Sequence, residues 1–180
     1  QPRLADMARR SVQLNTLDES IMIREGDLRE LVKETGHAVY DAITVNPPYM
    51  PLNGSDLKMN THQAMARHEI GCTLEEVIQA CSRLVRNGGK VSMVHRPQRL
   101  AEIISLMREY KLEPKRIRMV HPRAHLEANM VLIEGMKDGK PEVRMLPPLI
   151  VYNEEGKYCE EIMDIYYGQQ HAERTTKGGL

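Results

Sequence analysis

The residues best suited to chemistry are Asn46-Pro47-Pro48-Tyr49, which directly follow the apolar, β-branched stretch Ala38 to Val45. A residue that precedes proline is held extended, and proline itself has no N–H, so this segment forms a rigid arm that presents carbonyl oxygens. The side-chain oxygen of Asn46 and the backbone carbonyl of Pro47 can accept both hydrogens of an exocyclic amine. Because the lone pair of such an amine is delocalised, acceptors that favour a pyramidal nitrogen would activate it without a strong base.

Tyr49 adds a flat surface on which the group that carries the amine can stack. Stacking of a base on an aromatic side chain contributes about 1–3 kcal/mol, and a base within a helix or stem must be flipped out to reach such a site. Since stacking needs the ring and not the hydroxyl, this interpretation predicts that Tyr49→Phe is tolerated and Tyr49→Ala is not. The alternative interpretation is an ordinary proline turn that ends a strand.

Hydrophobic periodicity predicts that alternating strands and helices position this arm. We expect helices at 2–15, from the Thr73 and Glu76 capping box to Gly88-Gly89, from Pro97 through Met107 and at 158–167. We expect strands at 21–23, 38–45, 90–95, 116–121 and 129–134, and an extended stretch at 143–152. The first two strands are apolar enough to be buried, with a polar connector between them. The last two follow each other without a helix, as an antiparallel pair does.

This order of elements predicts an α/β fold with a mostly parallel sheet and an antiparallel edge hairpin. The arm then lies at the carboxyl end of its strand, where open α/β sheets bind ligands. A chain of 180 residues is long enough for one core. We therefore assign residues 1–168 to a single domain and expect 169–180 to form a mobile tail.

Composition excludes several classes of protein. With 41% hydrophobic and 28% charged residues the chain has the content of a globular protein, and no apolar run approaches the length needed to cross a membrane. The three cysteines have no C-x-x-C spacing, so neither a disulfide framework nor a zinc site is predicted, and a reducing cytoplasm is the expected location. The formal net charge is zero, yet residues 95–125 hold eight Lys or Arg against three acidic residues. A local basic patch is therefore predicted.

The run from Asp41 to Tyr49 resembles motif IV of the amino-group methyltransferases, a group that acts on adenine in nucleic acids or on glutamine in release factors. Other segments narrow the resemblance to the bacterial tRNA (adenine-N(6))-methyltransferases that modify the base beside the anticodon of a valine tRNA. These segments are Ala66-Arg67-His68-Glu69, Val94-His95-Arg96-Pro97, Pro114 to Arg118, Val120-His121-Pro122 and Glu127 to Glu134. The likeness runs from Gln1 to about Gly168.

This resemblance implies a Rossmann-like class I methyltransferase that uses S-adenosylmethionine and binds tRNA, with neither a metal nor a membrane partner. It implies that the target adenine is held by Asn46, Pro47, Pro48 and Tyr49, and that Asp27, Leu28 and Asn46 contact the cofactor. It also implies RNA phosphate contacts for Arg67, His68, Arg96 and Arg116. The glycine-rich loop and acidic strand end of the family are not found, so the resemblance places two further strands before Gln1.

Alternatives remain for the function and for single residues. A protein glutamine methyltransferase would use the same chemistry, and a non-catalytic RNA-binding protein would keep the arm without binding the cofactor. Asp27 follows a glycine, and an aspartate there is also common in a turn or at the start of a helix. Each basic residue could instead form a surface ion pair. We expect His95 and His121, at strand ends, to be structural.

Overall fold

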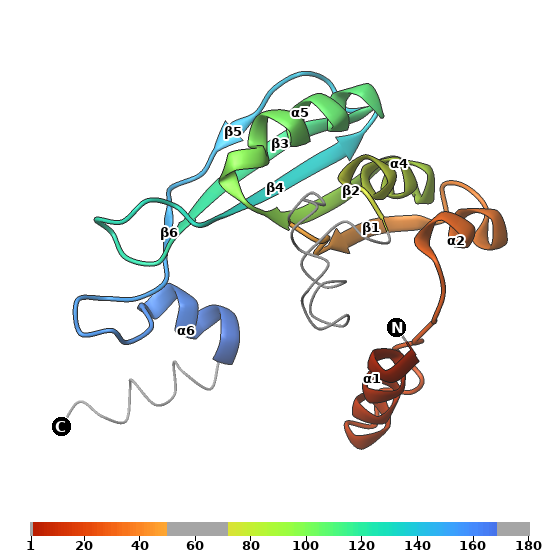
Figure 1. Ribbon diagram of the computed structural model, residues 1–180, viewed down its shortest axis with the longest axis horizontal. Coiled ribbons are helices and arrows are strands. Elements are labelled where there is room, and N and C mark those ends of the chain that lie inside the picture. Colours follow the sequence, from red (N-terminus) through yellow and green to blue (C-terminus); the bar gives the residue numbers. More distant parts are fainter. Residues whose placement is uncertain (1, 50–71, 169–180) are drawn as a thin grey trace, which may run out of the picture.

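The computed structural model describes residues 2–49 and 72–168 (Figure 1). Its helices are α1 (Pro2–Leu14), α2 (Leu28–Thr35), α4 (Leu74–Leu84), η2 (Pro97–Arg99), α5 (Leu100–Glu109) and α6 (Glu160–Tyr167). Its strands are β1 (Tyr40–Val45), β2 (Val85–His95), β3 (Leu112–His121), β4 (Met130–Lys137), β5 (Arg144–Met145) and β6 (Leu149–Ile150). Arg67, His68 and the expected tail at 169–180 lie outside the described residues.

The strands form one mixed sheet in the order β1-β2-β4-β3-β5, and β6 also pairs with β3. β1 is parallel to β2, and β5 and β6 are parallel to β3, whereas β4 is antiparallel to both β2 and β3. Of the described strands, β4 therefore runs alone in its direction, and the mostly parallel sheet with a β3–β4 hairpin is confirmed. The hairpin was expected at the edge of the sheet, but its antiparallel strand lies inside, because β4 fills the space between the parallel strands β2 and β3, and β3 pairs in turn with β5 and β6.

Helices α4 and α5 pack on the same face of this sheet (Figure 1). The capping box of Thr73 and Glu76 starts α4 as predicted, and the apolar side of α4 then enters the core. The largest fully buried side chains of that core include Leu74, Ile78, Ile103, Met107 and Ile133. This core anchors the middle of β2 and β4 and so fixes the strand end beside the arm.

Two of the predicted strands differ from the structure. Residues 21–23 form no strand, and Ile21 and Met22 are 42% and 84% exposed. A strand needs a ladder partner, and none of the described strands pairs with this run. Residues 40–45 do form β1, but its first three side chains are exposed and only Ile43 and Val45 are half-buried. Among the described strands β1 pairs with β2 alone, so it is an edge strand and the prediction of burial was wrong.

Two local predictions were also wrong. Helix α4 ends at Leu84, and Val85 through Gly89 already belong to β2. Val85 is extended and its N–H is bonded to the Cys81 carbonyl, so it ends the helix before the glycines are reached. The connector before β1 contains a helix, α2, whose apolar side buries Val32. Asp27 is its N-cap, a start signal that stands in the sequence.

Candidate functional site

The arm leaves β1 at the carboxyl ends of the two parallel strands. Val45, the last residue of β1, is in register with Met93 of β2, so Asn46 and the end of β2 at His95 lie at the same edge of the sheet. Pro47 is buried, Asn46 is exposed and Tyr49 is half-buried. The arm is thus anchored in its middle while the amide remains accessible to a ligand.

Within the arm, the Tyr49 hydroxyl donates a hydrogen bond to the side-chain oxygen of Asn46, with the oxygen atoms 2.5 Å apart. This contact orients the amide group on which the predicted chemistry depends. An amide oxygen has two lone pairs, so one acceptor position remains for the hydrogen of a target amine. The arm therefore carries the acceptor and the aromatic surface as a coupled pair.

The ring of Tyr49 contacts His95, the last residue of β2, and Arg96, which follows it. The rings of His95 and Tyr49 form a T-shaped pair, with the centroids 5.3 Å apart and the planes at 75°. The guanidinium carbon of Arg96 lies 5.3 Å from the Tyr49 ring centroid, and Arg96 Nη1 donates to the Asn129 carbonyl at 2.9 Å. The His95 side chain is fully buried, so the expectation of a structural role agrees with its position.

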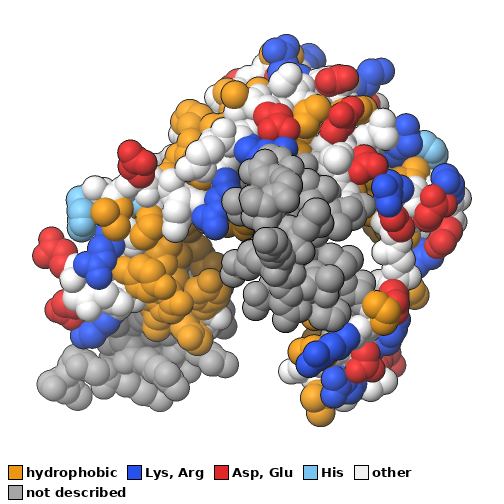
Figure 2. All heavy atoms as spheres, in the orientation of Figure 1, with side chains coloured by type: hydrophobic (Ala, Val, Ile, Leu, Met, Phe, Trp, Pro, Cys, Tyr) orange, Lys and Arg blue, Asp and Glu red, His pale blue; other side chains and the backbone are white. Residues whose placement is uncertain are grey.

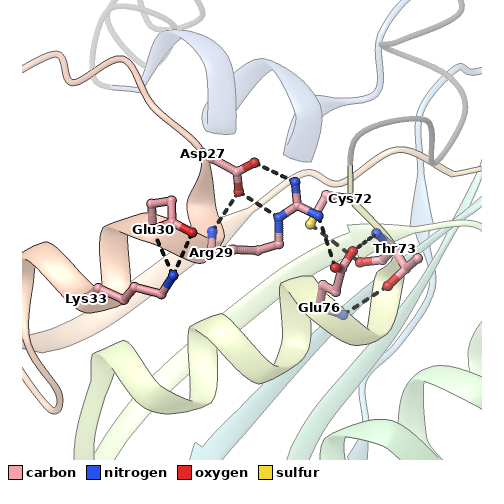
Figure 3. A network of polar contacts seen from close by, with 7 residues as sticks. All are labelled: Asp27, Arg29, Glu30, Lys33, Cys72, Thr73 and Glu76. Atoms are coloured by element: carbon pink, nitrogen blue, oxygen red, sulfur yellow. Dashed lines mark hydrogen bonds and ion pairs between the residues drawn. The ribbon is translucent and has the colours of Figure 1, made fainter.

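Asp27 forms a charged network with Arg29 that links α2 to α4 (Figure 3). Its Oδ1 accepts hydrogen bonds from the backbone N and the Nε of Arg29, and its Oδ2 accepts one from Nη2 at 2.6 Å. The third guanidinium nitrogen, Nη1, donates to Glu76 at 3.2 Å, and Glu76 completes the capping box of α4. The side-chain and backbone bonds from Arg29 lower the pKa of the Asp27 carboxyl to about 2. Asp27 thus serves as a helix cap, the alternative role considered for it.

A small hollow of about 170 Å³ adjoins two of the three residues expected to contact a cofactor, Asp27 and Leu28, whereas Asn46 does not line it. It is lined by Arg24, Glu25, Gly26, Asp27, Leu28, Leu31 and Glu34. Leu28 packs on the same core cluster as Ile43 and Val45 of β1, so this hollow and the arm adjoin one apolar core. Because binding pockets usually measure about 300–1,000 Å³, this hollow is large enough for only a portion of a ligand of ordinary cofactor size.

The sheet face opposite α4 and α5 forms a larger hollow of about 640 Å³ that includes Asn46. Its floor is a row of side chains in register across four strands, Thr44, Ser92, Glu134 and Arg116. Arg116 binds Glu134 through two hydrogen bonds, at 2.9 and 2.6 Å. Hydrogen bonding from Arg116 lowers the pKa of Glu134, whose side chain is only 14% exposed.

Much of the predicted basic patch is neutralised by acidic partners. Four arginines of residues 95–125 are paired: Arg99 with Glu102, Arg108 with Glu113, Arg116 with Glu134 and Arg118 with Glu161. Figure 2 shows positive and negative side chains interspersed over the face in view rather than one basic field. Arg116 therefore has the surface ion pair that was the alternative to its expected phosphate contact.

Neither a metal site nor a membrane-spanning helix is found in the part of the chain that the structure describes. Within residues 2–49 and 72–168, no group of three or more His, Cys, Asp or Glu side chains could hold a metal ion. Over the same residues no helix is long and apolar enough to cross a membrane.

The structure adds His95, Arg96 and Asn129 to the surroundings of the arm in ways the residue pattern did not predict. Arg96 was expected to meet RNA phosphate and His95 was expected to be structural only. The order of the strands in the sheet would have predicted that His95 and Arg96 lie beside the arm. Because β1 and β2 are parallel neighbours, the residues that end β2 must lie beside the residues that leave β1. Asn129 lies far along the chain and required the position of β4.

Comparisons with known proteins agree with this picture. No model of a protein family matches the chain. The tRNA1(Val) (adenine(37)-N6)-methyltransferase of Porphyromonas gingivalis is 27% identical over 135 residues, which cover 74% of this chain and 52% of that protein. The protein of the same name from Aeromonas salmonicida is 31% identical over 129 residues, with 72% and 52% covered. The chain spans about half the length of these curated relatives, and the resemblance predicted from its motifs is confirmed.

A solved structure supports the fold independently. A predicted O-methyltransferase from Agrobacterium tumefaciens superposes with a TM-score of 0.70 at 23% identity, over 94% of this chain and 74% of that one. The predicted Rossmann-like methyltransferase fold is thereby confirmed.

Proposed function

We propose that this chain is the part of an S-adenosylmethionine-dependent methyltransferase that holds the target adenine of a tRNA and activates its exocyclic amino group. The observation that carries the proposal is the arm at the end of β1, where an exposed amide lies beside a half-buried aromatic ring. The target is the adenine at position 37, because the curated relatives are named for that position. The expected site of action is the cytoplasm, where tRNA is modified.

Each residue of the arm has its own role in binding or activating the adenine. The free lone pair of the Asn46 amide oxygen and the Pro47 carbonyl accept the two amine hydrogens, which favours a pyramidal nitrogen with an available lone pair. Tyr49 stacks on the flipped adenine and orients Asn46 through its hydroxyl. Pro47 and Pro48 restrict the backbone, so these groups need little reorganisation when the base enters.

The described residues fit one portion of the cofactor. The hollow at Asp27 and Leu28 offers a carboxylate and an apolar surface, which suits an adenine ring and its amine. Both oxygens of Asp27 already bind Arg29, so a cofactor contact would use a remaining lone pair of that carboxylate. When bound, S-adenosylmethionine supplies an electrophilic methyl group. Asn46 would face the amine that receives it, and the methylated nitrogen, which is strongly acidic while it carries the extra proton, would release that proton to solvent without a titrating base.

Two measurements test the proposal. Isothermal titration of the protein with S-adenosylmethionine should show saturable binding, and incubation with tRNA should give N6-methyladenine by mass spectrometry of the digested RNA. An absence of cofactor binding would favour the non-catalytic RNA-binding alternative. Adenine and glutamine both present a planar nitrogen group to the arm, so both substrates are tested. Methylation of a glutamine in a release-factor peptide, with none in tRNA, would favour the glutamine methyltransferase.

A further inference from the structure

The hydrogen bond from Tyr49 to Asn46 cannot fix the ring of Tyr49 by itself. The hydroxyl oxygen lies on the axis about which an aromatic ring rotates, so this bond holds the tip of the side chain and leaves rotation about that axis free. A stacking surface needs a defined plane, and that plane requires contacts with the ring itself. Arg96 lies over a face of the ring at 5.3 Å from its centroid, and the ring of His95 forms a T-shaped pair with it at the same centroid distance.

Arg96 is itself held by contacts that do not involve the arm. Its Nη1 donates to the Asn129 carbonyl at 2.9 Å, and its backbone N–H donates to His95 Nδ1 at 2.8 Å. The backbone N–H of Asn129 in turn donates to the Val120 carbonyl at 3.0 Å, which ties this anchor to the end of β3. The guanidinium is therefore placed by the sheet, and the ring is placed against the guanidinium.

We propose that Arg96 is a positioning residue for the arm, which covers one face of Tyr49 and leaves the opposite face for the target base. The inference rests on the proposed function for the identity of that base. It differs from the expectation of a phosphate contact, because the contacts that the structure gives this guanidinium are with the Asn129 carbonyl and the Tyr49 ring. Arg96 then acts through Tyr49 rather than through the RNA backbone.

A double-mutant cycle on the protein separates the two roles. If Arg96 acts through Tyr49, Arg96→Ala should lower kcat roughly tenfold and should cause little further loss in the Tyr49→Ala background. The salt dependence of tRNA binding should stay unchanged in Arg96→Ala. A phosphate contact would instead flatten the slope of log K against log salt by about one and would combine additively with Tyr49→Ala. That result would overturn the proposal.

Arg108→Ala is the matched control, since Arg108 is an exposed arginine that pairs with Glu113 at 3.5 Å at the other end of α5. It should change neither kcat nor the salt slope. Arg96→Lys keeps a positive charge and loses the planar fork, so it should remain impaired in kcat. Full rescue of kcat by lysine would show that charge alone is needed and would contradict a stacking role. Far-UV circular dichroism of each variant shows that it is folded.

A second readout requires no methyl transfer. The chain contains no tryptophan, so Tyr49→Trp introduces a single tryptophan at the ring position, whose fluorescence can be excited apart from that of the remaining tyrosines. Removing Arg96 in that background should uncover one face of the indole, and quenching of its fluorescence by acrylamide should rise about twofold as the cation leaves the ring. Arg108→Ala should leave quenching unchanged. Equal quenching with and without Arg96 would refute the positioning role, whether or not the protein methylates tRNA.

Discussion

The hydroxyl of Tyr49 donates a hydrogen bond to the side-chain oxygen of Asn46, so the stacking residue of the arm also orients the amide acceptor of the arm. The residue pattern assigned these two roles to separate side chains. Their coupling means that a change in Tyr49 also disturbs the acceptor that activates the amine.

Asn46→Ala should abolish methyl transfer and leave the affinity for S-adenosylmethionine nearly unchanged, because Asn46, although also expected to contact the cofactor, does not line the hollow at Asp27 and Leu28 and its amide acts on the target amine. Loss of one preorganised polar contact of this kind costs on the order of 10²–10³ in rate. Single-turnover rates and cofactor titration measure the two quantities separately. Turnover close to that of the unchanged protein would exclude this role of Asn46.

Tyr49→Phe keeps the ring and loses the bond that orients Asn46. We now expect a loss in kcat of about tenfold, the cost of roughly one hydrogen bond, where the residue pattern alone predicted tolerance. Tyr49→Ala removes the stacking surface as well, so it should lower kcat and raise KM more than Tyr49→Phe does. If the Phe variant matches the unchanged protein, the hydroxyl has no part in orienting the amide.

Arg116→Ala tests whether the predicted basic patch meets RNA. Because the guanidinium is bound by Glu134, we expect no change in the salt dependence of tRNA affinity. We also expect a loss of stability of up to about 1 kcal/mol from the broken surface ion pair. Binding at several salt concentrations and urea unfolding measure the two effects. A slope that flattens by about one would restore Arg116 as a phosphate contact.

The sequence predicted the elements whose signals are local. The capping box of Thr73 and Glu76, the strand that precedes the arm, the β3–β4 hairpin and the last helix all match the structure, because caps, β-branched runs and periodicity act over a few residues.

Prediction failed where the outcome depends on distant partners. Residues 21–23 have the composition of a strand, but a strand forms only beside another one. The position of β4 between β2 and β3 is likewise set by pairing. The site divides in the same way. Asn46 and Tyr49 were predicted as site residues from their position and composition, whereas the contacts of Arg96 with Tyr49 and Asn129 depend on which strands are neighbours.

Gly89→Ala should destabilise the protein, because an added Cβ would lie 2.8 Å from the Asp41 carbonyl oxygen and 2.9 Å from that of Arg86. Backbone atoms cannot move away as a flexible side chain can, so we expect an overpacking cost of about 1–3 kcal/mol. Gly26→Ala is the control, since nothing lies within 4 Å of a Cβ there. Thermal unfolding of both variants is the measurement. Equal melting temperatures would show that the β1–β2 junction adapts without cost.

Asp27→Asn tests the charged network that links α2 to α4. The folded-state pKa of Asp27 is about 2, below the ordinary value of 3.8, because Arg29 donates hydrogen bonds to the ionised carboxylate. A depressed folded pKa stabilises the protein above pH 3.8, and this contribution is lost as the pH falls through about 2. Asparagine still caps the helix but cannot form an ion pair with Arg29.

The unfolding free energy of the unchanged protein should therefore exceed that of Asp27→Asn above pH 3.8, and the difference should shrink as the pH falls toward 2. Urea unfolding of both proteins at a series of pH values measures this difference. Arg29→Gln removes the donor instead of the carboxylate and should converge with the unchanged protein over the same range. A difference that stays constant down to about pH 2 would mean that the Arg29 contacts do not favour the ionised form of Asp27.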